Sequence, residues 1–110
     1  MSESDRNAAD LLHMLGHLYM KSGNHKRGLV LLLLAERAAP GHPGILRTLT
    51  QAFTTTGDAQ RALNTIDHLE YLEGPSPTLS LLQSRALWTA GRHADARHCF
   101  RDYLQRRSDA

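Results

Sequence analysis

The sequence is poor in cysteine, proline and aromatic residues. Its single cysteine, Cys99, excludes a disulfide within the chain and indicates a reducing compartment. Four of the 110 residues are proline, and Phe, Trp and Tyr together make up 5%. Leu and Ala are abundant instead, and both favour helices over strands. A length of 110 residues suits one domain and is too short for two separate cores.

Long apolar runs and strongly basic segments are also missing. The longest apolar run spans residues 29–35, whereas a membrane-spanning helix needs about 20 residues, so we expect no membrane insertion. The first five residues are polar and partly acidic, so we expect no signal peptide. The net charge is +2 with acidic and basic residues interspersed, which predicts no nucleic-acid binding.

An internal repeat is the strongest pattern in the sequence. Gly23, Gly57 and Gly91 follow one another at intervals of 34 residues. Small residues recur five positions later, and large apolar residues nine positions later: Gly28, Ala62, Ala96; Leu32, Ile66, Phe100. A period of 34 residues is that of the tetratricopeptide repeat. We therefore expect one all-α domain over 1–110, a superhelix of three repeats (9–42, 43–76 and 77–110) after a polar lead at 1–8, with no separate capping helix.

Local signals set the expected helix ends. Pro43 and Pro77 suit the first turn of a helix, where the missing amide hydrogen costs nothing, and Asp58 is placed to cap another helix. The turns at Gly23, Gly57 and Gly91 need a permissive backbone. Six antiparallel helices are expected at 8–21, 25–39, 43–56, 59–72, 76–90 and 93–107.

The helix expected at 25–39 is apolar on all sides. Its core face needs only three leucines: Leu29, Leu32 and Leu33. Three further residues are surplus to that face: Val30, Leu31 and Leu34. Because a helix that is apolar all round must be covered, a protein partner is expected to bind these three residues.

The last expected helix uses up the third repeat and leaves no capping helix. Phe100 is expected to face inward against the first helix of its repeat. Tyr103 and Leu104 lie where a following repeat would pack. Two alternatives stay open for this pair: they contact a partner, or they fold back onto the second repeat.

The concave groove of such an array is lined by the first helix of each repeat. The expected lining residues are His13, His17, Met20 and Lys21, then Arg47, Gln51 and Thr54, then Leu81, Arg85 and Trp88. Trp and Arg are enriched in binding hot spots. Trp88 could instead belong to the core, but Leu87 already holds the core position. The basic residues Lys21, Arg47 and Arg85 favour a partner that carries carboxylates.

No catalytic or metal-binding pattern is complete. His13 and His17 are four residues apart and could form half a zinc site, but no suitable ligand completes it. His98 and Cys99 diverge by about 100° on a helix, so they do not form a nucleophile–base pair. We expect no enzyme activity, no metal and no cofactor.

Several strings resemble the SctY (YscY-type) chaperones of bacterial type III secretion. The third repeat carries most of this resemblance: Ser84-Arg85-Ala86, Gly91, Ala96-Arg97-His98, Phe100 and Tyr103-Leu104. In the first repeat, Gly23 followed by a leucine-rich helix that ends before Pro40 is similar too.

The resemblance implies a cytosolic bacterial chaperone without enzyme activity. Such a chaperone forms a heterodimer with a small secreted protein of the SctX type, shields its apolar part and helps present it to the export gate. Two alternatives remain. One is a chaperone for needle or translocator subunits, and the other is a general peptide-binding scaffold that grips a terminal carboxylate through Lys21, Arg47 and Arg85.

Overall fold

A computed structural model describes residues 2–109 of the chain. Met1 begins the expected polar lead and Ala110 ends the expected third repeat, and both lie outside the described residues. The described residues form six α-helices: α1 (Glu3–Lys21), α2 (His25–Ala38), α3 (Pro43–Thr55), α4 (Ala59–Glu73), α5 (Pro77–Thr89) and α6 (His93–Asp109).

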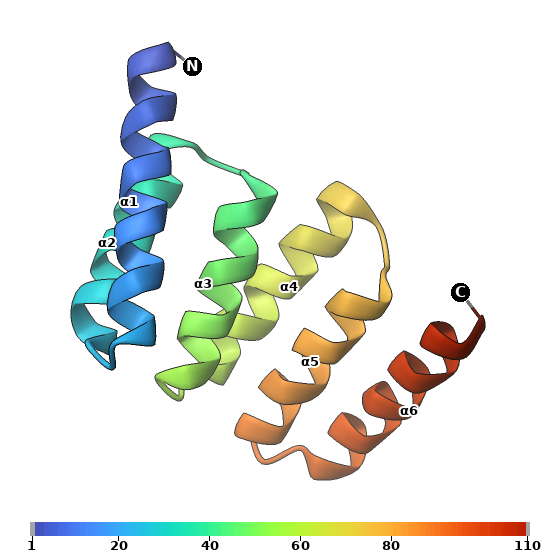
Figure 1. Cartoon of the computed structure of the whole chain (residues 1–110). Helices are drawn as coiled ribbons and strands as arrows, with labels where there is room; N and C mark the ends of the chain where they lie inside the picture. The colour runs from blue at the N-terminus through green and yellow to red at the C-terminus, as the bar shows by residue number, and fades with distance from the viewer. Residues whose placement is uncertain (1, 110) are drawn as a thin grey trace.

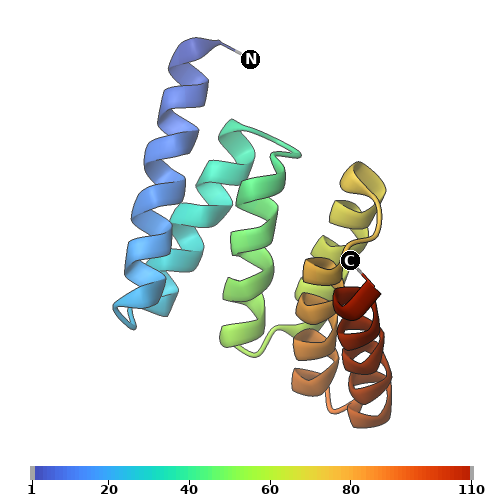
Figure 2. The ribbon, with the colours of Figure 1, turned by 45° about the vertical axis from the view of Figure 1, so that its right-hand side comes forward.

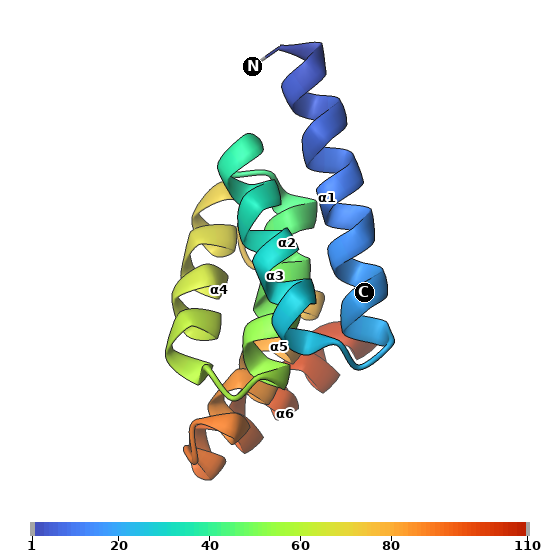
Figure 3. The ribbon, with the colours of Figure 1, turned by 90° about the vertical axis from the view of Figure 1, so that its left-hand side faces the viewer.

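The helices form three antiparallel hairpins in a row (Figure 1). The hairpins are α1/α2, α3/α4 and α5/α6, and each packs against the next, so the first and third lie at opposite ends. Turning the molecule shows the row from its side and the start of α1 extending past the other helices (Figures 2 and 3). The body measures 42 × 27 × 20 Å.

Helix ends agree with the sequence prediction within two residues, apart from one. The exception is α1, which begins at Glu3 rather than at residue 8. The Ser2 hydroxyl accepts a hydrogen bond from the Asp5 amide at 3.1 Å, and acidic residues in the first turn suit the positive end of the helix dipole. The expected polar lead is therefore mostly helix.

The turn within each hairpin is built in the same way three times. Gly23, Gly57 and Gly91 have φ values of +88°, +84° and +80°, a conformation that favours glycine. In the first turn the Gly23 amide bonds to the Met20 carbonyl and the Asn24 amide to the Tyr19 carbonyl. The other two turns repeat this pair of bonds, which closes the helix end in a Schellman motif.

Close contact between α1 and α2 depends on two glycines. A Cβ atom at Gly16 would lie 2.7 Å from Cγ of Leu32, and one at Gly28 would lie 2.8 Å from Sδ of Met20. Neither distance leaves room for a side chain. Small residues at these two positions therefore allow α1 and α2 to approach closely.

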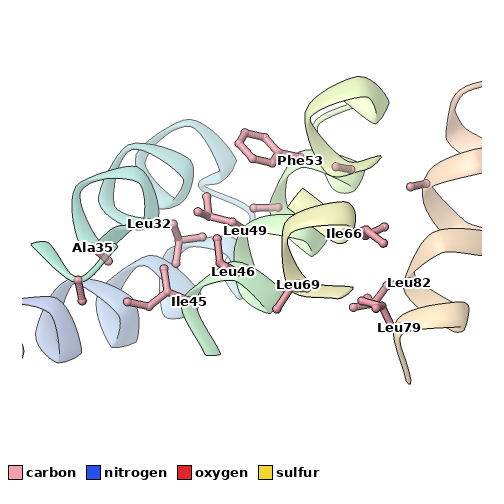
Figure 4. Packing of buried hydrophobic residues seen from close by; sticks show 14 of the residues in the cluster. Leu32, Ala35, Ile45, Leu46, Leu49, Phe53, Ile66, Leu69, Leu79 and Leu82 are labelled. Atoms are coloured by element: carbon pink, nitrogen blue, oxygen red, sulfur yellow. The ribbon is translucent and has the colours of Figure 1, made fainter. Parts of the chain in front are cut away.

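The core consists of two joints between hairpins (Figure 4). Apolar residues of α2 meet apolar residues of α3 at the first joint, and those of α4 meet those of α5 at the second. The residues of the first joint are Leu32, Ala35, Ile45, Leu46 and Leu49; those of the second are Ile66, Leu69, Leu79 and Leu82. Each hairpin is thus stabilised by the apolar residues that the neighbouring hairpin packs against it.

Phe100 does not face inward as the sequence suggests. It is 43% exposed, while Leu32 and Ile66, which hold the same position in the first two hairpins, are 0% exposed. The reason is the neighbour: α3 lies beside α2 and α5 beside α4, but no described helix follows α6.

Candidate partner-binding surfaces

An open hollow lies between α1 and α2 on the first hairpin. We call it the N-terminal hollow; its volume is about 570 Å³ and its lining residues are Leu15, Tyr19, Lys26, Arg27, Val30 and Leu31. The helical spacing of residues 15 and 19 on α1 and of residues 27, 30 and 31 on α2 places these side chains along one seam. The floor is apolar, and the two basic residues lie at one end of it, near the start of α2.

The fold does not require the surplus apolar residues of α2. Val30 and Leu34 are exposed, and Leu31 is half-buried in the hollow. The second hairpin has Asn64 and His68 where the first has Val30 and Leu34. The same packing is therefore reached with polar residues at these positions.

A second open surface lies between α5 and α6. We call it the C-terminal groove; its volume is about 520 Å³ and its lining residues are Leu81, Ser84, Arg85, Trp88, Ala96, Arg97, Phe100 and Arg101. Trp88 is 54% exposed and its ring stacks on that of His93, with centroids 4.0 Å apart. Leu87 is buried, so the core position is filled without Trp88.

Positive charge surrounds this groove. Arg85, Arg97 and Arg101 line it together with apolar side chains, and no carboxylate is among the lining residues. Within residues 2–109 none of the three forms a salt bridge; neighbouring Arg92 and Arg106 do so with Asp95 and Asp102. The groove thus combines an aromatic floor with unpaired guanidinium groups.

The residues predicted to line the groove from the first repeat lie elsewhere. His13 is half-buried at the first joint, where its Nε2 atom lies 2.7 Å from the Thr48 hydroxyl. Burial lowers the pKa of His13, and the nearby rings of His42 and His17 lower it further. Met20 packs against Gly28, while His17 and Gln51 are exposed and line a small cleft between α1 and α3 with Met20.

Arg47 is engaged by its own hairpin. Its guanidinium donates to the Glu73 carboxylate at 2.6 Å, and both side chains are partly exposed. Arg47 lines a separate cleft with Glu73 and Leu82, away from the C-terminal groove. Of the predicted set, Leu81, Arg85 and Trp88 line the C-terminal groove, Arg47 lines the cleft beside Glu73, and His17, Met20 and Gln51 line the cleft between α1 and α3.

Tyr103 and Leu104 do not fold back onto the second repeat. In residues 2–109, α6 packs on α5 and on no other helix. Tyr103 is half-buried and stacks on Phe100 with ring centroids 5.7 Å apart, whereas Leu104 is exposed. This leaves the partner-facing alternative for Leu104.

No activated nucleophile or metal cluster is present in the described residues. Burial raises the pKa of the Cys99 thiol, and the carboxylates of Asp102 and Asp95 raise it further. A raised pKa keeps the thiol protonated and unreactive. Residues 2–109 contain no group of three or more His, Cys, Asp or Glu side chains that could hold a metal ion.

Sequence reasoning missed an apolar stripe on α1. Leu11, Met14 and Leu18 are all exposed and follow one another at helical spacing. Leu11 shares the register of Ile45 and Leu79, which are both buried. Among residues 2–109 no hairpin packs on α1 from the side that α2 covers on α3 and α4 covers on α5, so this position stays exposed on the first hairpin.

Comparison with known proteins identifies the fold. No protein-family model matches the sequence, and no curated protein sequence matches it. A solved structure described as MamA MSR-1 C2, a tetratricopeptide-repeat protein, is similar with a TM-score of 0.78 and 20% identity. The chain is a three-repeat tetratricopeptide superhelix.

The similarity covers 97% of this chain and 62% of the MamA chain, so the chain spans less than two thirds of that protein. At 20% identity the likeness shows the fold alone. Within residues 2–109 no helix combines the length and apolarity needed to cross a bilayer.

Proposed function

We propose that this protein is a cytoplasmic chaperone without enzyme activity that covers an apolar helix of a protein partner. The partner class is a small export substrate of the SctX type, held as a heterodimer and presented to the export gate of a type III secretion system. The resemblance to SctY-type chaperones supports the partner class. The N-terminal hollow supports the mode of binding.

The surplus apolar residues of α2 are the observation that carries this proposal. Val30 and Leu34 are exposed, and polar residues occupy the same positions in the second hairpin, so folding alone does not explain them. Exposed apolar residues that line a hollow are typical of sites that bind a partner. A protein whose first task is to keep an apolar partner soluble needs such a surface.

The chemistry of the hollow describes the partner segment. Its apolar floor, with Lys26 and Arg27 at one end, fits an amphipathic helix that carries carboxylates near one end of its apolar face. The helix would pack along the seam between α1 and α2, where a preceding hairpin would otherwise lie. Neither a nucleotide nor a metal takes part in this binding mode.

Co-expression with an SctX-type protein from the same genome tests the proposal. The expected result is a stable 1:1 complex that co-purifies and that the Leu31→Glu variant no longer forms, because a carboxylate is placed on the apolar floor. Thr65→Glu is the matched control, since Thr65 holds the same position in the second hairpin and lies outside the hollow.

Two results would contradict the proposal. One is the absence of any complex with the SctX-type protein. The other is a complex that Leu31→Glu and Thr65→Glu weaken equally. Circular dichroism of each variant separates loss of binding from loss of folding.

A further inference from the structure

The exposed stripe on α1 is a hairpin-to-hairpin contact surface that lacks its neighbour. Leu11 is 52% exposed, whereas Ile45 and Leu79 hold the same position in the next two hairpins and are 1% and 7% exposed. Leu18 is likewise exposed where Ala52 is buried. The difference arises because α3 and α5 each pack against a preceding hairpin. The stripe is therefore the same kind of surface that is buried twice inside the chain.

The C-terminal groove is the opposite half of that contact. At the first joint α3 covers the corresponding positions of α1 and α2, and His13 bonds to Thr48 there. At the second joint α5 covers those of α3 and α4. In the third hairpin these positions include Leu81 and Phe100, and they line an open groove. The groove therefore lies where the first helix of a following hairpin would pack.

The charges of the groove restrict its occupant further. Leu29 and Leu33 of the first hairpin pack against the core, but Arg97 and Arg101 replace them in the third hairpin. Both arginines line the groove. The occupant must therefore carry carboxylates beside its apolar stripe.

The first helix of this chain carries both an apolar stripe and carboxylates. Between residues 3 and 10, α1 carries Glu3, Asp5 and Asp10 against one base, Arg6. At both joints the start of a hairpin lies beside the end of the preceding one (Figure 1). In the same arrangement the acidic start of α1 would lie beside the end of α6, whose last turn carries Arg106 and Arg107.

We propose that α1 of one molecule docks into the C-terminal groove of a second copy, so that copies stack head to tail and continue the superhelix. The two surfaces in contact are different, so each stack keeps a free α1 stripe at one end and a free groove at the other. Stacks grow as the protein concentration rises.

This inference goes beyond the proposed function and is linked to it. In a stack, α6 of the preceding copy covers the positions of Leu15 and Tyr19, as α2 covers Leu49 and Phe53 inside the chain. Leu15 and Tyr19 also line the N-terminal hollow. A partner in the hollow and a stacked copy therefore exclude each other.

Sedimentation velocity of the purified full chain over a dilution series tests the stacking. The expected result is a sedimentation coefficient that rises with concentration for the wild type. Leu18→Glu on the stripe and Phe100→Glu in the groove each give a monomer. Tyr71→Glu, at an exposed position of α4 outside both surfaces, is the control and stacks like the wild type.

Mixing the two monomeric variants tests the polarity. Leu18→Glu keeps an intact groove and Phe100→Glu an intact stripe, so an equimolar mixture forms dimers with one joint and no longer species. A mixture that stays monomeric overturns the proposal. So does a wild-type chain that is monomeric at every concentration, because the groove then serves a different protein.

Separate controls distinguish an effect on folding from an effect on stacking or partner binding. Circular dichroism checks each variant, and Arg101→Glu, at an exposed position, is a second groove variant expected to prevent stacking without disturbing the core. The two proposals fail independently: Leu31→Glu is expected to abolish partner binding and keep stacking, because residue 31 lies outside the joint. Phe100→Glu is expected to abolish stacking and keep partner binding.

Discussion

The first and third hairpins have the same backbone arrangement and different surfaces. In the first, α2 is apolar all round and buries Leu32 completely. In the third, α6 is rich in arginine, and Ala96 is its one buried residue among those described. Leu32 and Phe100 hold the same position in the repeat, and only Leu32 is enclosed. Burial in this array therefore depends on the neighbouring hairpin more than on the side chain itself.

The largest expected difference between the two hairpins is in stability. Leu32→Ala is expected to lower the free energy of unfolding by about 2–5 kcal/mol, since it leaves a cavity between α2 and α3. Phe100→Ala is expected to cost about 1 kcal/mol, because the side chain is already partly exposed to solvent. Urea unfolding followed by circular dichroism measures both. Equal losses would mean that Phe100 is a core residue and that the comparison fails.

A smaller effect is expected at His13, whose position in the third hairpin is taken by Leu81. Burial, aided by His42 and His17, lowers the pKa of His13 in the folded state. The folded protein therefore holds the neutral ring, and the associated stability is complete above the ordinary pKa of 6.5 and is lost as the pH falls below it.

His13→Leu copies the third hairpin and is expected to reduce the acid sensitivity of the unfolding midpoint. Urea titrations on either side of neutral pH measure this change, with the exposed His68→Gln as control. Thr48 keeps a hydrogen bond in the variant, because its hydroxyl also donates to the Gly44 carbonyl. An unchanged pH profile would assign the sensitivity to another residue.

The smallest effect is expected at the ion pair of the second hairpin. Glu73→Gln removes the partner of Arg47, and the exposed position limits the loss to less than about 1 kcal/mol. Differential scanning calorimetry at low and high salt measures it. A loss as large as that of Leu32→Ala would show that the pair supports the second joint, which its solvent exposure argues against.

The period of 34 residues predicted most of the fold. It located all six helices and the positive-φ glycines of the three turns within hairpins, because each residue type is needed at a fixed place in a hairpin. The period did not predict the early start of α1, because the Ser2 hydroxyl and nearby acidic residues determine where this helix begins. Such capping lies outside the repeat.

The candidate site was harder to predict from the sequence. Spacing assigned His13, Met20 and Arg47 to a groove, but it cannot show which face of a helix a neighbouring hairpin covers. The grouping of Leu81, Arg85 and Trp88 was predicted because all three lie on one helix. Arg97 and Phe100 were missed as their neighbours because they come from the next helix.

The limited contacts of α6 have a consequence for how the molecule opens. Among residues 2–109 this helix touches α5 alone, while α3 is packed by helices on both sides. In a linear array, detaching a terminal element breaks one interface and leaves the others intact. Helix α6 is therefore expected to detach and reattach while α3 stays folded. Amide hydrogens should then exchange with solvent fastest in α6 and slowest in α3.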